Sequence, residues 1–213
     1  MSKKIFAEFL GTFTLIFLGA GAIVSGKADL IGVAFAHGLA IFVMVSALAG
    51  ISGAHFNPAV STAMLMTKKI DIKEFLIFVA SQMSGAAVAS LALCYIYGKE
   101  NGYGLPAIAS ETTIGAGFLA EVIGTAFLLF VIFGVAVDKR SSVAKIAGLP
   151  IGLTITAIIF SVGPITGAAL NPARWFGPAL ISGDWSNAWL YIFAPILGGV
   201  MAAVTYQSIA KPE

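Results

Sequence analysis

The sequence predicts an all-α protein that crosses a membrane several times, and three observations support this prediction. Of its 213 residues, 59% are hydrophobic and only 10% are charged, whereas a soluble domain usually has about 25% charged residues. The apolar residues fall in stretches of about 20, the length of a membrane-spanning helix. The two halves of the chain also resemble each other, as described below.

The same composition argues against several other classes of protein. Intrinsic disorder requires low hydropathy and high charge, and the mean hydropathy here is +0.97. Cys94 is the only cysteine, which excludes a disulfide scaffold within the chain. A net charge of +2 with no clustered basic face argues against a partner that is a nucleic acid.

We expect six membrane-spanning helices, each bounded by charged or turn residues. They cover approximately 5–25, 30–50, 75–97, 114–137, 146–162 and 188–209. The first follows Lys3 and Lys4, as the apolar core of a secretory signal would. Glu8 interrupts its apolar run, however, and a similar pattern recurs in mid-chain, so we expect a retained helix.

Two further helices are too short to cross the membrane. The stretches 57–66 and 171–181 each begin with Asn-Pro-Ala and continue for about ten residues. At 1.5 Å per residue each spans about 15 Å, half of a hydrocarbon core of about 30 Å. We therefore expect two re-entrant half-helices that enter the membrane without crossing it.

The basic residues predict the orientation. If the six helices alternate in direction, nine basic residues fall on one side and two on the other, with Arg174 set aside. The nine are Lys3, Lys4, Lys68, Lys69, Lys73, Lys139, Arg140, Lys145 and Lys211, and the two are Lys27 and Lys99. The positive-inside rule then places both termini in the cytoplasm. We take the host membrane to be the inner or plasma membrane of the cell.

An internal repeat relates the two halves. The sequence AEFLGT at 7–12 returns as AEVIGT 113 residues later, and SGAHFNPA at 52–59 returns as TGAALNPA 114 residues later. Each unit holds three full spans, an odd number, so the second unit enters from the opposite face. We expect a single membrane domain, 1–213, with inverted repeats at about 1–98 and 114–213 joined by a loop at 99–113.

The inversion brings the starts of the half-helices together near the middle of the membrane. These starts are Asn57-Pro58-Ala59 and Asn171-Pro172-Ala173. Each Asn oxygen is expected to cap its helix, which leaves the amide NH₂ as a donor aimed into a lumen. Each helix N-terminus adds about half a positive charge. Such a site accepts a neutral oxygen and repels a cation, which favours a passive pore that excludes protons and ions.

With these motifs, the sequence is identified as a member of the major intrinsic protein family and resembles an aquaporin. SGAHFNPAV and GAALNPARWFGPA stand where that family has its two signature loops, and the likeness covers nearly the whole chain. The resemblance implies six spans, two re-entrant half-helices and a homotetramer with one pore per subunit. It implies a channel. Separately, the sequence contains no Ser/His/Asp set, metal-ligand cluster or Gly-rich phosphate loop, so we expect no enzyme, cofactor or metal.

The resemblance also implies a selectivity filter of four residues. Arg174 follows the second signature and is a basic residue at membrane depth, where function is the default interpretation. Residues at the spacings found in similar proteins are His37, Ile159 and Ala168. This set is most like that of the plant vacuolar aquaporins. It predicts passage of water, with ammonia, hydrogen peroxide and urea as further solutes and a glycerol or small-polyol facilitator as the alternative.

Three other polar residues are expected to brace the signature loops. Glu8 and Glu121 occupy equivalent positions in the two halves, and carboxylates there either accept hydrogen bonds from irregular backbone or relay protons. Their duplication favours bracing, which similar proteins show, and His55 is expected to brace the first loop. A secondary transporter is the rival class because it too uses inverted repeats and broken helices, but it would normally need titratable groups in the lumen. The lumen expected here offers amides, one His and one Arg, which favours a passive pore.

Overall fold

The computed structural model describes residues 1–98 and 102–210, and the described residues form helices and loops without strands. Lys99 and Lys211, which entered the charge count, and the first residues of the predicted loop 99–113 lie outside them. Six helices are long and apolar enough to cross a membrane. They are α1 (Ser2–Val24), α2 (Leu30–Ser52), α4 (Ile72–Tyr97), α5 (Ile114–Ile132) continued by the π-helical η2 (Phe133–Val137), α6 (Gly148–Thr166) and α8 (Ala188–Ile209). The fold class predicted from the sequence is therefore confirmed.

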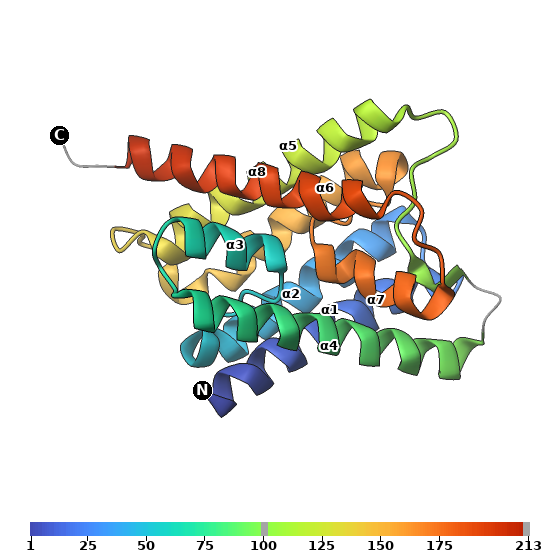
Figure 1. The fold of residues 1–213 in the computed structure, drawn as a ribbon, viewed down its shortest axis with the longest axis horizontal. Coiled ribbons are helices and arrows are strands. Elements are labelled where there is room, and N and C mark those ends of the chain that lie inside the picture. The colour runs from blue at the N-terminus through green and yellow to red at the C-terminus, as the bar shows by residue number, and fades with distance from the viewer. Residues whose placement is uncertain (99–101, 211–213) are drawn as a thin grey trace.

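The two half-helices are α3 (Pro58–Met66) and α7 (Pro172–Ser182). Figure 1 shows them in opposite halves of the bundle, and the start of α1 and the end of α8 at one common end. The two ends of the helical chain lie at the same end of the bundle because a chain that crosses six times, an even number, returns to the side from which it started.

The fifth spanning helix ends later than the sequence predicted. We expected it to end at Val162, before Gly163 and Pro164, but α6 continues through Pro164 to Thr166. A membrane helix tolerates an internal proline where its surroundings compensate for the missing N–H. The helix ends at Gly167, whose left-handed φ of 78° and N–H bond to the Gly163 carbonyl form an ordinary C-cap.

Three helix pairs form the wall of the bundle: α1 against α4, α5 against α8, and α2 against α6. The α2–α6 contact is very close, because a Cβ on Gly38 would overlap the Thr156 hydroxyl. That hydroxyl donates to the Ala34 carbonyl at 3.3 Å. The close approach fixes α2 and α6 relative to each other, and these are the two helices that carry His37 and Ile159.

Candidate functional site

The two Asn-Pro-Ala turns begin the half-helices as the sequence predicted. Asn57 and Asn171 have extended backbones, and each is followed by a proline in the first helical position. The Asn57 Oδ1 accepts the Ala59 N–H at 2.8 Å, and the Asn171 Oδ1 accepts the Ala173 N–H at 2.9 Å. Each oxygen therefore serves as an N-cap, so the amide nitrogen faces away from its own helix.

The amide groups of these two residues join the halves of the molecule. Asn57 Nδ2 donates to the Leu170 carbonyl at 2.8 Å, and Asn171 Nδ2 donates to the Phe56 carbonyl at 2.9 Å. The expectation that the whole NH₂ is free for the lumen was wrong, because the carbonyl before each turn takes one N–H of the opposite amide. An amide carries two such hydrogens, so one per Asn is left over from these bonds.

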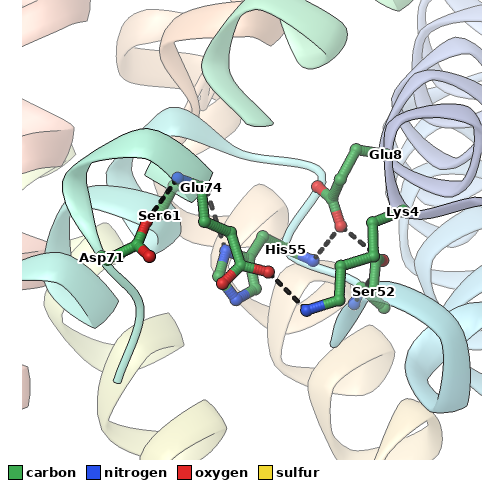
Figure 2. Close-up of polar contacts among 8 residues, drawn as sticks. Lys4, Glu8, Ser52, His55, Ser61, Asp71 and Glu74 are labelled. Atoms are coloured by element: carbon green, nitrogen blue, oxygen red, sulfur yellow. Dashed lines mark hydrogen bonds and ion pairs between the residues drawn. The ribbon is translucent and has the colours of Figure 1, made fainter. Parts of the chain in front are cut away.

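Glu8 holds the first signature loop from α1. Its carboxylate accepts the Ser52 hydroxyl at 2.6 Å and the backbone N–H groups of His55 and Phe56 at 3.0 and 2.8 Å. Figure 2 shows Glu8 beside Ser52 and His55. Phe56 has a left-handed φ of 51°, a conformation that costs about 1–2 kcal/mol for a residue other than glycine. The carboxylate bonds compensate for that cost.

Glu121 holds the second loop from α5 in the same way. It accepts the Thr166 hydroxyl at 2.6 Å and the N–H groups of Ala169 and Leu170, both at 2.8 Å. Leu170 is left-handed with a φ of 55°, matching Phe56 in the first loop. Both carboxylates are fully buried, and each accepts two backbone N–H groups of its signature loop.

Each loop has one further set of polar contacts, and the two sets differ. At the second loop, the Tyr191 hydroxyl donates to the Thr166 carbonyl at 2.8 Å. At the first loop, the additional contacts come from His55 and Gln82. His55 Nδ1 lies 3.0 Å from the Ser61 hydroxyl, and its ring meets Phe78 edge-on. Gln82 of α4 donates to both Glu8, at 2.7 Å, and Ser61, at 2.9 Å. Gln82 was not identified from the sequence, although an amide in the middle of a spanning helix is the signal that would have identified it.

Arg174 is held by two acceptors. Its Nε donates to His37 Nε2 at 3.2 Å, and one terminal nitrogen donates to the Gly104 carbonyl at 2.7 Å. His37 Nδ1 lies 2.8 Å from the Val33 carbonyl. Because a carbonyl only accepts and an arginine only donates, His37 carries its proton on Nδ1 and offers a lone pair on Nε2. Gly104 was not identified from the sequence, since it lies in η1 (Gly102–Gly104), far from both motifs.

The four predicted filter residues line one elongated cavity of about 450 Å³. Two apolar stripes run along it, with one residue from each successive turn of a helix. The stripe on α2 starts at the polar His37 and continues through Ile41, Val45 and Ala49. The stripe on α6 runs through Ile159, Ile155 and Ile151 and ends at Ala147, the residue just before the helix. The α2 stripe alone covers roughly 18 Å at 1.5 Å per residue. Asn57 and Asn171 line the same cavity, so the two amides and the four filter residues are brought together. The remaining residues of the two motifs, Pro58, Ala59, Pro172 and Ala173, are buried in the first turns of α3 and α7 and do not line the cavity.

Charged residues line the cavity at the end away from His37. Lys4 of α1 and Glu74 of α4 form an ion pair, which Figure 2 shows beside Ser52 and His55, and Lys69 also lines the cavity. From the sequence, only amides, one His and one Arg were expected in the lumen. These additional charges were missed because Lys4 and Glu74 lie 70 residues apart.

Comparison with known proteins agrees with this architecture. Residues 1–206 match the family described as Major intrinsic protein. Aquaporin NIP1-1 of Zea mays is 39% identical over 212 residues, which cover 97% of this chain and 74% of the relative. Glycerol uptake facilitator protein-like 6 of Lactiplantibacillus plantarum is 42% identical over 209 residues, which cover 94% of this chain and 95% of the relative.

A solved structure shares the whole fold. The aquaglyceroporin from Plasmodium falciparum superposes with a TM-score of 0.88 at 28% identity, covering 98% of this chain and 96% of that one. Aquaporin TIP4-4 of Zea mays is 35% identical over 217 residues, with 97% of this chain and 86% of the relative covered. The similarity thus extends beyond the vacuolar type to NIP and glycerol-facilitator proteins. The chain belongs to the major intrinsic protein family.

Proposed function

We propose that this small-solute channel is a passive pore for water and other small neutral solutes, and that it excludes protons and ions. The observation that carries the proposal is the meeting of the α3 and α7 N-termini beside a continuous cavity, where Asn57 and Asn171 each bond the opposite loop. Each N-terminus contributes about half a positive charge there. The remaining amide hydrogens orient a water oxygen, and the positive potential raises the barrier for a cation.

Arg174 provides the second barrier, beside His37 in the wall of the cavity. It is buried, and its contacts with His37 and Gly104 hold the guanidinium in place at the cavity wall. A fixed cation repels protons and metal ions, and its unused N–H groups bind the oxygen of a passing neutral molecule. Together with His37, Ile159 and Ala168, Arg174 forms the selectivity filter of this proposal.

A glycerol facilitator is the second candidate function, and a specific observation favours it. The bacterial relative at 42% identity is named a glycerol uptake facilitator, and the solved neighbour is an aquaglyceroporin. The Ile159 and Ala168 side chains are neither aromatic nor charged, so they leave room at the filter. Ammonia, hydrogen peroxide and urea are the other solutes that the pore is expected to pass.

Side-by-side flux measurements separate these functions. Purified protein in liposomes is subjected to an osmotic step, and shrinkage is followed by stopped-flow light scattering. We expect faster shrinkage than in protein-free vesicles, and then faster uptake of ammonia than of glycerol. Glycerol uptake faster than ammonia uptake would reverse this ranking, and shrinkage no faster than in empty vesicles would exclude a water channel.

We further propose one channel domain built of two inverted halves, with both termini in the cytoplasm of the host cell and four copies assembled into a homotetramer. Among the described residues, no group of three His, Cys, Asp or Glu side chains is placed to hold a metal ion. We propose no enzymatic activity, cofactor or metal. Reporter fusions at each terminus test the orientation. Native mass spectrometry in detergent tests the assembly, and a monomer as the main species would contradict the tetramer.

A further inference from the structure

Gly19 of α1 lies directly behind the His37 ring. A Cβ atom on Gly19 would lie 2.6 Å from His37 Nε2 and closer still to Cδ2 of the same ring. Real Cβ atoms essentially never approach a heavy atom within 3.0 Å. His37 lines the cavity, and Gly19 is not among the lining residues. The missing side chain at Gly19 therefore makes the space that the Nε2 edge of the ring occupies.

The next residue of α1 supports the other acceptor of Arg174. Gly104 approaches Ala20 so closely that a Cβ on Gly104 would lie 2.9 Å from the Ala20 Cβ and 3.1 Å from its carbonyl oxygen. The Gly104 carbonyl is the group that accepts the Arg174 guanidinium. Two adjacent small residues of α1 thus support both groups that hold Arg174.

α1 has little room to move away from the ring. On the side facing α4, a Cβ on Gly85 would overlap the Phe9 carbonyl oxygen and lie 3.1 Å from the Phe13 nitrogen, so the two backbones are in direct contact. A Cβ on Gly11 would overlap the Phe56 ring of the first signature loop. A methyl group at position 19 must therefore displace the His37 ring, away from α1 and toward the cavity.

We propose that Gly19 is a positioning residue for solute selection. By leaving space for the ring, it keeps the His37 Nε2 lone pair at the Arg174 Nε and holds both side chains against the pore wall. The proposal rests on the pore function proposed above. It assigns a selectivity role to a residue that offers no side chain to the lumen.

Four variants in liposomes test the proposal, with osmotic water flux and glycerol uptake as the readouts. They are Gly19→Ala, His37→Ala, the double variant, and Gly50→Ala as the matched control. Gly50 also lies in a spanning helix, and a Cβ there would meet no atom within 4 Å. We expect Gly19→Ala to lower water permeability by about fivefold, the factor that corresponds to one lost hydrogen bond, and glycerol permeability by more. Gly50→Ala should match the wild type.

The double variant distinguishes positioning from a general packing defect. Without the imidazole ring the alanine methyl has nothing to displace, so Gly19→Ala/His37→Ala should conduct like His37→Ala alone. If Gly19→Ala does not fold, recovery of folded protein in the double variant supports the same contact. Equal fluxes in Gly19→Ala and wild type, or the same fold-change in both backgrounds, would overturn the proposal. A wild type that conducts neither solute would instead overturn the pore function itself.

Discussion

Replacing Glu121 with glutamine tests how the second signature loop is held. One carboxylate oxygen accepts both the Thr166 hydroxyl and the Ala169 N–H, and the other accepts the Leu170 N–H. Glutamine keeps one oxygen and presents an NH₂ in place of the other. Whichever oxygen is replaced, at least one buried backbone N–H then faces another N–H and has no acceptor.

The expected cost follows from that count. One buried unsatisfied backbone group costs about 1–3 kcal/mol, and the loop also contains the left-handed residues Ala168 and Leu170. We therefore expect Glu121→Gln to lower the free energy of unfolding by about 1–3 kcal/mol. Because Ala168 and Arg174 lie on either side of the turn, water permeability should fall as well.

The assay is denaturant unfolding in detergent, followed by tryptophan fluorescence, with water flux measured on the same preparations. Trp175 lies next to Arg174 at the start of α7 and stacks on Tyr191, so it reports on this region. Glu111→Gln is the control, because Glu111 is exposed and bonds only the neighbouring Ser110 hydroxyl among the described residues. An unfolding free energy and a water flux equal to the wild type would refute the reasoning.

Three further predictions concern the filter and the loop after α5. Arg174→Ala should raise the proton flux into liposomes by roughly fivefold or more, because two unit charges 4 Å apart repel each other by about 1 kcal/mol even in bulk water. A pH-sensitive dye inside the liposomes measures this flux, and an unchanged flux would contradict a role of Arg174 in proton exclusion. Ile159→Phe should lower glycerol uptake more than water flux, because it narrows the cavity at the filter; equal losses would place Ile159 away from the narrow point. The side-chain and backbone hydrogen bonds from Arg140 hold the pKa of Asp138 below its ordinary value of 3.8. The stability from this contact is therefore present above pH 3.8 and is lost as pH falls through the lowered pKa. Carbon-13 NMR should give a midpoint below 3.8 that Arg140→Ala raises, and a midpoint unaffected by that variant would contradict the assignment.

The spanning helices and half-helices were predictable because each is encoded locally. Apolar length identifies the six spans, and Asn-Pro-Ala combines a good N-cap with a proline in the first helical position. The hydrogen bonds that Glu8 and Glu121 accept from the loops also agree with what the repeat suggested. The end of α6 was misjudged because the sequence does not show whether the surroundings of Pro164 compensate for its missing N–H.

Contacts between distant segments were not predictable in this way. The bonds from Asn57 and Asn171 to the opposite loops depend on how the two halves dock, which no local pattern specifies. The Gly104 carbonyl is a backbone group, so the residue type at this position does not indicate that it accepts a hydrogen bond from Arg174. Gly19 acts through the space it leaves, and a glycine in an apolar helix is ordinarily interpreted as a helix-packing position.

The central claim is that opposed half-helices form a pore that conducts water and blocks protons. The most direct measurement records osmotic shrinkage and internal pH in the same proteoliposomes, with a proton gradient imposed alongside the osmotic step. Our account predicts water flux well above that of empty vesicles while the internal pH follows the empty-vesicle trace. Water flux equal to that of empty vesicles, or a pH change that rises with the water flux, would contradict it.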